Sequence, residues 1–169
     1  MTTGRLVAVF LIVAGLLAGG AMYYLQVYAY YDRLPARDAI TLTPLGAVSA
    51  RVVPVRDFRG IDSDSSPLRF RACFTVNAPL EGITPYPEPA PLIAPRWFDC
   101  FDAEAISAAL AEGTAQAYLG RSNFEYGFDR VVAVFEDGRA VAWHQMNRCG
   151  AAVYDGLPPP EGCPPPPED

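Results

Sequence analysis

The first part of the chain is a long apolar run without charge. No residue between Arg5 and Asp32 is charged, and the segment from Leu6 to Leu25 is by itself long enough to cross the ~30 Å hydrocarbon core of a bilayer as a helix. The end of this run carries aromatic residues of the kind that collect at the membrane–water interface, namely Tyr23, Tyr24, Tyr28, Tyr30 and Tyr31. The pattern therefore predicts a single transmembrane anchor over residues 1–31, with the lipid bilayer as its first partner.

A cleaved signal peptide is the alternative interpretation of the same run. Arg5, the apolar stretch that follows it and Ala18-Gly19-Gly20 meet the usual requirements for such a peptide. However, the apolar character continues past the cleavage site into the tyrosines, where a secreted protein has no use for it. We therefore favour the anchor.

Small residues recur along one face of the expected helix. Gly15 and Gly19 form a GxxxG pair, which lets the backbone of a second helix approach closely. Small residues are also common in membrane helices that make no such contact. We expect an integral membrane protein to bind at this face through helix–helix packing.

Beyond the anchor, residues 32–38 are expected to form a linker, residues 39–150 a folded domain, and residues 151–169 a proline-rich, acidic tail. The clearest strand pattern is the period-2 alternation from Leu68 to Val76. It predicts a strand with one buried and one exposed face. The residues before it, Asp57 to Pro67, are rich in Gly, Asp and Ser and predict a loop.

The second half of the domain contains one expected helix and one expected hairpin. Asp102 is a good N-cap and Gly113 a natural helix end, so a helix is predicted between them. Asp137-Gly138 predicts a two-residue type I′ turn that joins strands 130–135 and 140–145. The segment 79–95 holds too many prolines for either element. The expected fold class is α+β, a small and mostly antiparallel sheet with one helix.

Composition narrows the choice of partners. The formal net charge is −6 and the pI is near 4.7, which argues against nucleic acid as a ligand. All thirteen basic residues are Arg. Together with the abundance of Ala and Pro, this composition is typical of a bacterial protein from a GC-rich genome.

The four cysteines indicate an oxidising compartment. They are even in number, lack a CxxC pair, and lie too far apart for the close ligand pairs of zinc sites. We predict the disulfides Cys73–Cys100 and Cys149–Cys163. The first would fix the return of the proline-rich segment to the sheet, and the second would fasten a tail that is too polar to fold by itself.

The cysteines also bear on orientation. Arg33 and Arg37 on the domain side slightly favour the opposite topology, but long domains translocate largely regardless of charge. We expect a single pass through the bacterial inner membrane, with the N-terminus in the cytoplasm and the C-terminal domain in the periplasm.

Few residues suggest chemistry. His144 is the only histidine and lies in an expected strand; it suits a general base or a metal ligand, but a lone strand histidine is more often structural. The acidic residues Asp57, Asp62 and Asp64 suggest calcium, yet the rest of an EF-hand loop is absent, which favours a solvated turn. No catalytic residue, cofactor site or metal site is predicted.

Several segments resemble a known family: GGAMYYLQVYAYYDRLP, GIDSDSSPLRFRACFT, WFDCFDAEAI and WHQMNRCG. They are similar to small alphaproteobacterial single-pass membrane-anchored periplasmic proteins of unknown function. The resemblance spans nearly the whole chain and implies one N-terminal helix and a periplasmic domain that holds all the cysteines. It implies no catalytic residues.

Two functions follow as hypotheses. The first is a non-enzymatic accessory or assembly protein of a larger membrane complex, such as a respiratory or photosynthetic one; the energy-transducing character rests on the bacterial class alone. The second is a periplasmic protein that handles metal (copper) or thiol redox chemistry through Cys73, Cys100 and His144. Free thiols with bound copper would favour the second, and two fixed disulfides the first.

Overall fold

A computed structural model describes residues 2–47 and 49–167. The chain divides into two compact units at Asp32/Arg33. The first unit is helical and the second is the sheet domain, and each is described by itself.

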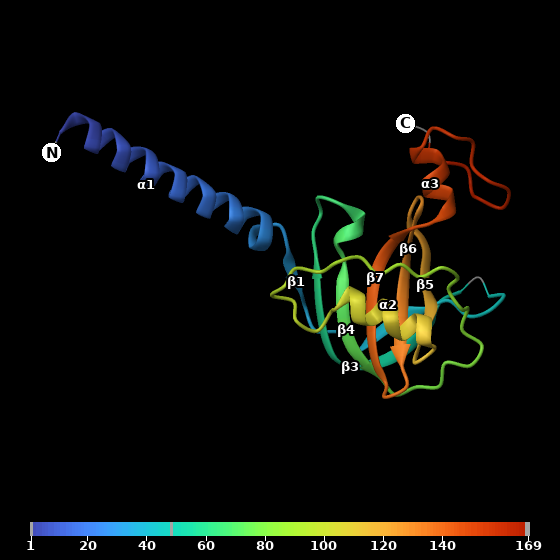
Figure 1. Cartoon of the computed structure of the whole chain (residues 1–169). Helices are drawn as coiled ribbons and strands as arrows, with labels where there is room; N and C mark the ends of the chain where they lie inside the picture. The colour runs from blue at the N-terminus through green and yellow to red at the C-terminus, as the bar shows by residue number, and fades with distance from the viewer. Residues whose placement is uncertain (1, 48, 168–169) are drawn as a thin grey trace. The chain divides into compact units, whose positions relative to one another are not determined.

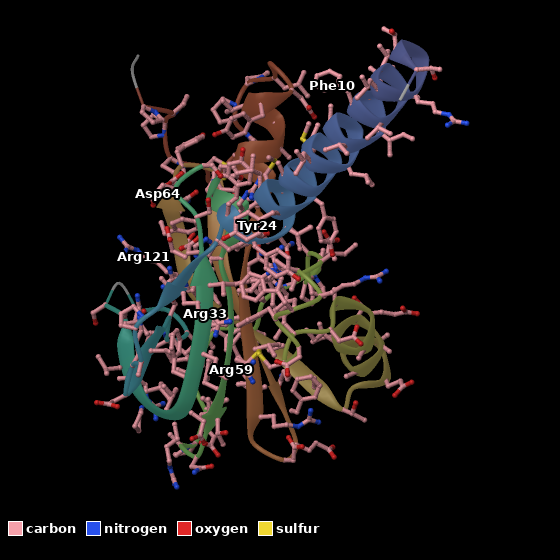
Figure 2. The ribbon with its side chains drawn as sticks, turned by 90° about the vertical axis from the view of Figure 1, so that its left-hand side faces the viewer. Phe10, Tyr24, Arg33, Arg59, Asp64 and Arg121 are labelled. Carbon is pink, nitrogen blue, oxygen red and sulfur yellow. A yellow bond between two sulfur atoms is a disulfide. The ribbon has the colours of Figure 1, made fainter. Side chains whose placement is uncertain are left out.

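The N-terminal unit is one long helix. Helix α1 (Thr3–Tyr24) continues into the π-helical turn η1 (Leu25–Ala29), and none of its described residues is buried. Its large apolar side chains are exposed, and Phe10 projects outward from the ribbon (Figure 2). The span Thr3–Ala29 is long and apolar enough to cross a membrane, a property that a signal sequence shares.

The second unit is built on a seven-stranded sheet in the order β1-β3-β4-β7-β6-β5, with β2 paired to β3. The pairings β2–β3, β3–β4, β4–β7, β7–β6 and β6–β5 are all antiparallel. The α+β fold class is therefore confirmed. The strands are β1 (Asp32–Leu34), β2 (Ala39–Leu42), β3 (Arg51–Asp62), β4 (Arg71–Val76), β5 (Ala115–Glu125), β6 (Phe128–Phe135) and β7 (Arg139–Met146). Strand β1 falls within the segment 32–38 for which the sequence predicts a linker.

The sheet curves so that its two ends approach each other. Just after β2, Thr43 donates its backbone N–H to the carbonyl of Leu119 on β5 and accepts from Thr84. The Thr43 hydroxyl also donates to Gly120. These bonds enclose the concave face of the sheet, where the main core gathers: Leu42, Val53, Val55, Phe70, Ala72, Phe74, Val76, Ile83, Val132, Ala140 and Ala142.

The other face of the sheet is covered as well, which differs from the prediction of a half-exposed strand at 68–76. Arg71 and Cys73 on β4 are buried, and so is Trp143 on β7. A long irregular segment crosses this face and leads into helix α2 (Ala103–Glu112), as Figure 1 shows. Phe101 contacts Trp143 edge-on. The alternation correctly predicts a strand over Arg71–Val76, but the expected first residues of that strand lie in a 3₁₀ turn, Pro67–Arg69. The proline-rich segment buries the polar side of the strand.

Strand β3 extends through part of the expected loop, so the prediction of a loop over 57–67 is wrong for its first half. The pairing of β3 with β4 shifts by one residue between Arg56 and Arg59, and Asp57 adopts a φ of 55°. This is a β-bulge, which changes the face to which the following residues point. As a result Phe58, rather than Asp57, packs on the concave core and stacks with Phe74.

The predicted hairpin is confirmed, but its turn is of another type. Gly138 donates its N–H to the carbonyl of Phe135, and Gly138 has a φ of 84°. Asp137 does not share a positive φ, as a type I′ turn would require. The connection is a three-residue loop with glycine in the left-handed position.

Both helices of the domain have side-chain caps. Asp102 accepts the N–H groups of Glu104 and Ala105, and Gly113 ends α2 in the left-handed conformation, as predicted. A further helix, α3 (Arg148–Tyr154), was not expected from the sequence. Asn147 caps it by accepting from the N–H groups of Cys149 and Gly150.

The sheet domain contains two disulfides, and they are the pairs that the sequence predicts. Cys73 on β4 is bonded to Cys100, just before α2, across 27 positions. Cys149 in α3 is bonded to Cys163, across 14 positions. Figure 2 shows Arg59, whose position on β3 is opposite Cys73, close to a disulfide. No described cysteine is free.

We predict that the two bridges differ in their effect on stability. In the loop-entropy estimate, removing Cys73–Cys100 lowers the free energy of unfolding by about 3–4 kcal/mol and removing Cys149–Cys163 by about 3 kcal/mol. The loss from removing Cys73–Cys100 should exceed this estimate, because Cys73 lies in the covered face of the sheet. Thermal unfolding of the two double Cys→Ser variants measures this, and a larger loss from the Cys149/Cys163 variant would contradict it.

Candidate functional site

His144 occupies the centre of a buried polar cluster at the concave side of the sheet. Its side chain is 3% exposed. Nδ1 lies 2.7 Å from the carbonyl oxygen of Pro67, and Nε2 lies 3.0 Å from Nε of Arg130 on β6. Arginine can only donate, so Nε2 must be the acceptor, and the ring proton is on Nδ1, which donates to Pro67.

Aromatic rings enclose this imidazole. Phe70 is nearly parallel to it at 4.5 Å between centroids, and Phe124 lies at 3.8 Å. The guanidinium of Arg130 also packs over Phe70, at 4.6 Å. Such stacking stabilises an arginine in a partly apolar place. The cluster joins β5, β6 and β7 to the short 3₁₀ turn η2 (Pro67–Arg69) and to Phe70, which follows that turn.

This environment keeps His144 uncharged. Burial, and then the charge of Arg130, lower the pKa of the imidazole to about 3, although the bond to Pro67 acts in the opposite direction. The neutral ring has no free nitrogen, because Nδ1 donates and Nε2 accepts. His144 is therefore arranged as a structural residue and offers neither a general base nor a metal ligand in this conformation.

A second polar cluster surrounds Asp129, which the sequence analysis did not single out. Its Oδ1 accepts from the N–H of Asn123 and from Nδ2 of Asn147, both at 2.8 Å, and from the hydroxyl of Ser122 at 3.3 Å. Oδ2 accepts from the Tyr86 hydroxyl. Burial, together with Asp129, raises the pKa of Tyr86 above its ordinary value.

The Asp129 cluster connects three segments that are distant in the sequence. Asn123, with a φ of 44°, lies in β5 and accepts from Gly127 at the β5–β6 turn. Asn147 caps α3, and Tyr86 belongs to the proline-rich segment. The sequence offers one signal for this cluster, which is that Asp129 lies beside the apolar run of β6. An acidic residue buried in such a place needs hydrogen-bond partners.

Two of the three acidic residues that suggested calcium, Asp62 and Asp64, line one open pocket, and Asp57 is not part of it. Asp57 forms the bulge in β3, while Asp62 ends that strand and accepts from the N–H of Ser63. The Ser63 and Ser65 hydroxyls bond to each other. Over residues 2–47 and 49–167, the structure contains no group of three or more His, Cys, Asp or Glu side chains that could hold a metal ion.

A profile of the family of unknown function DUF6446 matches residues 40–164. The chain belongs to this family. No curated protein matches the chain. No solved structure matches it either.

The DUF6446 match covers β2 to β7, both polar clusters and all four cysteines, and it excludes α1. The sheet domain is therefore the part that family membership describes. Gly15 and Gly19, the predicted helix-packing residues, lie outside the match. Nothing in the described chain lies within 4 Å of a Cβ built at either glycine, so a helix–helix contact at this face stays a prediction.

Arg71 holds the proline-rich segment of the DUF6446 domain against the sheet. Arg71 is 3% exposed and donates to four backbone carbonyls, those of Leu68, Phe70, Leu92 and Ile93. It also packs over Phe101. A guanidinium with five donors in a fixed plane suits this task. Arg71 thereby fastens a segment that forms few ladder bonds of its own.

The buried, neutral His144 should make the stability of the DUF6446 domain depend on pH. Its folded pKa lies below the unfolded value of about 6.5, so the unfolded state binds more protons between pH 3 and 6.5. Its contribution to stability is complete above that window and decreases as the pH falls through it. Between pH 7 and pH 4.5 the loss should be roughly 2–3 kcal/mol.

Urea unfolding of the full-length protein in detergent at both pH values measures this loss, with His144→Gln as the matched control. Glutamine can donate and accept as the imidazole does but does not titrate. The raised pKa of Asp62, caused chiefly by burial, acts in the opposite direction and is present in both proteins. An equal pH dependence in wild type and variant would contradict the assignment.

Proposed function

We propose that this protein is a non-enzymatic accessory or assembly protein of a larger membrane complex. Helix α1 acts as a single-pass anchor in the bacterial inner membrane, with the N-terminus in the cytoplasm and the DUF6446 domain in the periplasm. The domain presents a rigid, disulfide-bonded surface to a partner.

One observation supports the non-enzymatic role above the others. The buried residues that could do chemistry use their polar groups to hold the fold together. His144 is bonded at both nitrogens, Asp129 accepts four hydrogen bonds, and Arg71 donates to four carbonyls. A catalytic acid, base or nucleophile needs a group that can reach the substrate.

The anchor is supported by the length and exposure of the helix. Twenty-seven residues, Thr3–Ala29, reach about 40 Å at ~1.5 Å per residue, which exceeds the ~30 Å hydrocarbon core. Exposed apolar side chains on all sides suit a lipid environment. The periplasmic placement rests on the two disulfides, since such bonds persist in oxidising compartments.

The competing hypothesis is a periplasmic protein that handles copper or thiol redox chemistry. It requires Cys73, Cys100 and His144 as ligands or reactive groups. Cys73 and Cys100 are bonded to each other, and both nitrogens of His144 are engaged. The geometry favours the accessory role for this reason, and copper binding by the oxidised protein would support the competitor.

Membrane fractionation tests the anchor and its orientation together. The intact chain should stay in the pellet after high-salt and carbonate washes. Protease added to spheroplasts should remove the sheet domain and leave a short helical fragment in the membrane. A soluble product that begins near Ala21 would show that α1 is a signal peptide, and a domain protected from protease would contradict the periplasmic orientation.

The partner should depend on the small-residue face of α1. We expect Gly15→Leu/Gly19→Leu to keep membrane insertion but to lose at least half of the proteins recovered with the native chain after gentle detergent extraction, because leucine blocks close backbone approach. Gly20→Leu, about 100° away around the helix, is the matched control. Unchanged recovery with the double variant would show that this face contacts only lipid.

A further inference from the structure

A small cavity of about 130 Å³ opens in the concave face of the sheet. Its walls are mainly apolar and aromatic, with Phe58, Phe70, Phe74 and Val132 among them. This volume is close to that of cavities, of about 150 Å³, that bind one benzene ring. The bulge at Asp57 contributes directly, because it places Phe58 in this wall.

Two arginines also line this cavity, and the guanidinium group of each packs over one of its phenylalanines. Arg37 packs over Phe58 at 5.6 Å, and Arg130 packs over Phe70 at 4.6 Å. Two ion pairs in the described part of the chain, Arg59 with Asp99 and Arg139 with Asp137, involve neither of the cavity arginines. Arg130 donates Nε to His144, which is a neutral partner.

The surroundings concentrate positive charge at this place. Burial, and then Arg37 and Arg121, lower the pKa of Arg130, whereas Asp62 acts in the opposite direction without forming an ion pair. Two cations beside an apolar cavity repel each other unless an anion lies between them. The whole chain has a net charge of −6, so the local charge beside the cavity is opposite in sign to that of the chain.

We propose that the cavity binds a small carboxylic acid with an apolar body. The carboxylate would lie on Arg37 and Arg130, and a ring or short branched chain would lie among Phe58, Phe70 and Phe74. The proposal goes beyond the accessory role and does not depend on the anchor or on the partner of α1.

The chemistry of the walls selects this class of ligand. The planar fork of arginine matches a carboxylate in a bidentate arrangement. Apolar pockets with a few placed polar groups are the common form of small-molecule sites, including those in the mouths of curved sheets. A multiply charged, strongly hydrated ligand would leave its charges against the phenylalanines without hydrogen bonds, which is costly.

The same chemistry could come from two sources, a soluble acid or a fatty acid. The cavity volume accommodates about one ring, so a fatty acid would need to extend its chain outside the cavity. Calorimetric titration of the full-length protein in phosphatidylcholine nanodiscs distinguishes them, with phenylacetate and laurate as probes and empty nanodiscs as the blank. We expect phenylacetate to bind with one-to-one stoichiometry and its neutral amide to bind at least tenfold more weakly.

Arg37→Gln is the principal variant, because Arg37 is exposed and its loss leaves the core intact. We expect it to weaken phenylacetate binding about five- to tenfold, as for the loss of one charged hydrogen-bond donor. Arg33→Gln is the charge-matched control, since Arg33 packs over Trp97 and is not among the residues that line the cavity, and it should change affinity less than twofold. Ala142→Val, which adds two carbons to the cavity lining, should also weaken binding.

In another outcome, laurate binds at least tenfold more tightly than phenylacetate and loses as much affinity in Arg37→Gln. That result would support the proposal, with a fatty acid as the ligand. If neither acid binds at a concentration on the order of 10 mM, the proposal is overturned. Equal affinity for the acid and its amide, or equal losses in Arg37→Gln and Arg33→Gln, would overturn it too. None of these failures would affect the anchor, which fractionation tests separately.

Discussion

The hydrogen-bonded series Arg130–His144–Pro67 is the contact on which the concave side of the domain depends. The bond from Arg130 requires an unprotonated Nε2, and the bond to Pro67 requires a proton on Nδ1. A charged imidazole would place a proton against the guanidinium and repel it. The neutral ring therefore fixes the position of Arg130, and through it the charged end of the cavity.

The other buried polar groups follow the same principle. Each lies where an irregular segment meets the sheet. Its side-chain hydrogen bonds hold that segment, which forms few of the backbone hydrogen bonds of a paired strand. Arg71 holds the backbone near Leu92, and Asp129 holds Tyr86 and the cap of α3. Burying polar groups is costly unless they are paired. Here they are paired within the fold, and this pairing is the observation from which the non-enzymatic role is proposed.

The elements that depend on local patterns could be predicted from the sequence. The alternation before Val76, the cap at Asp102 and the hairpin at Gly138 all act through neighbouring residues. The cap is found as predicted, the strand begins three residues later than predicted, and the hairpin has a longer loop than the predicted type I′ turn. The disulfide pairs followed from a topological argument about Cys100 and Cys163.

The remainder depends on contacts between distant segments, which a single sequence does not reveal. The bulge at Asp57 follows from pairing with β4. Helix α3 is held by Asn147 and by the close approach of Gly127 to Gly150, where an added Cβ would collide with backbone atoms. His144 looked like an isolated strand residue because its partners, Pro67 and Arg130, are 77 and 14 positions away.

The central claim is that His144 is neutral and serves structure. As the only histidine, it gives a single set of imidazole signals in nitrogen-15 NMR of the full-length protein in detergent. The structure predicts a neutral ring protonated on Nδ1, unchanged from pH 7 to pH 4.5. A ring that titrates near its ordinary pKa of about 6.5, or that carries its proton on Nε2, would contradict the claim.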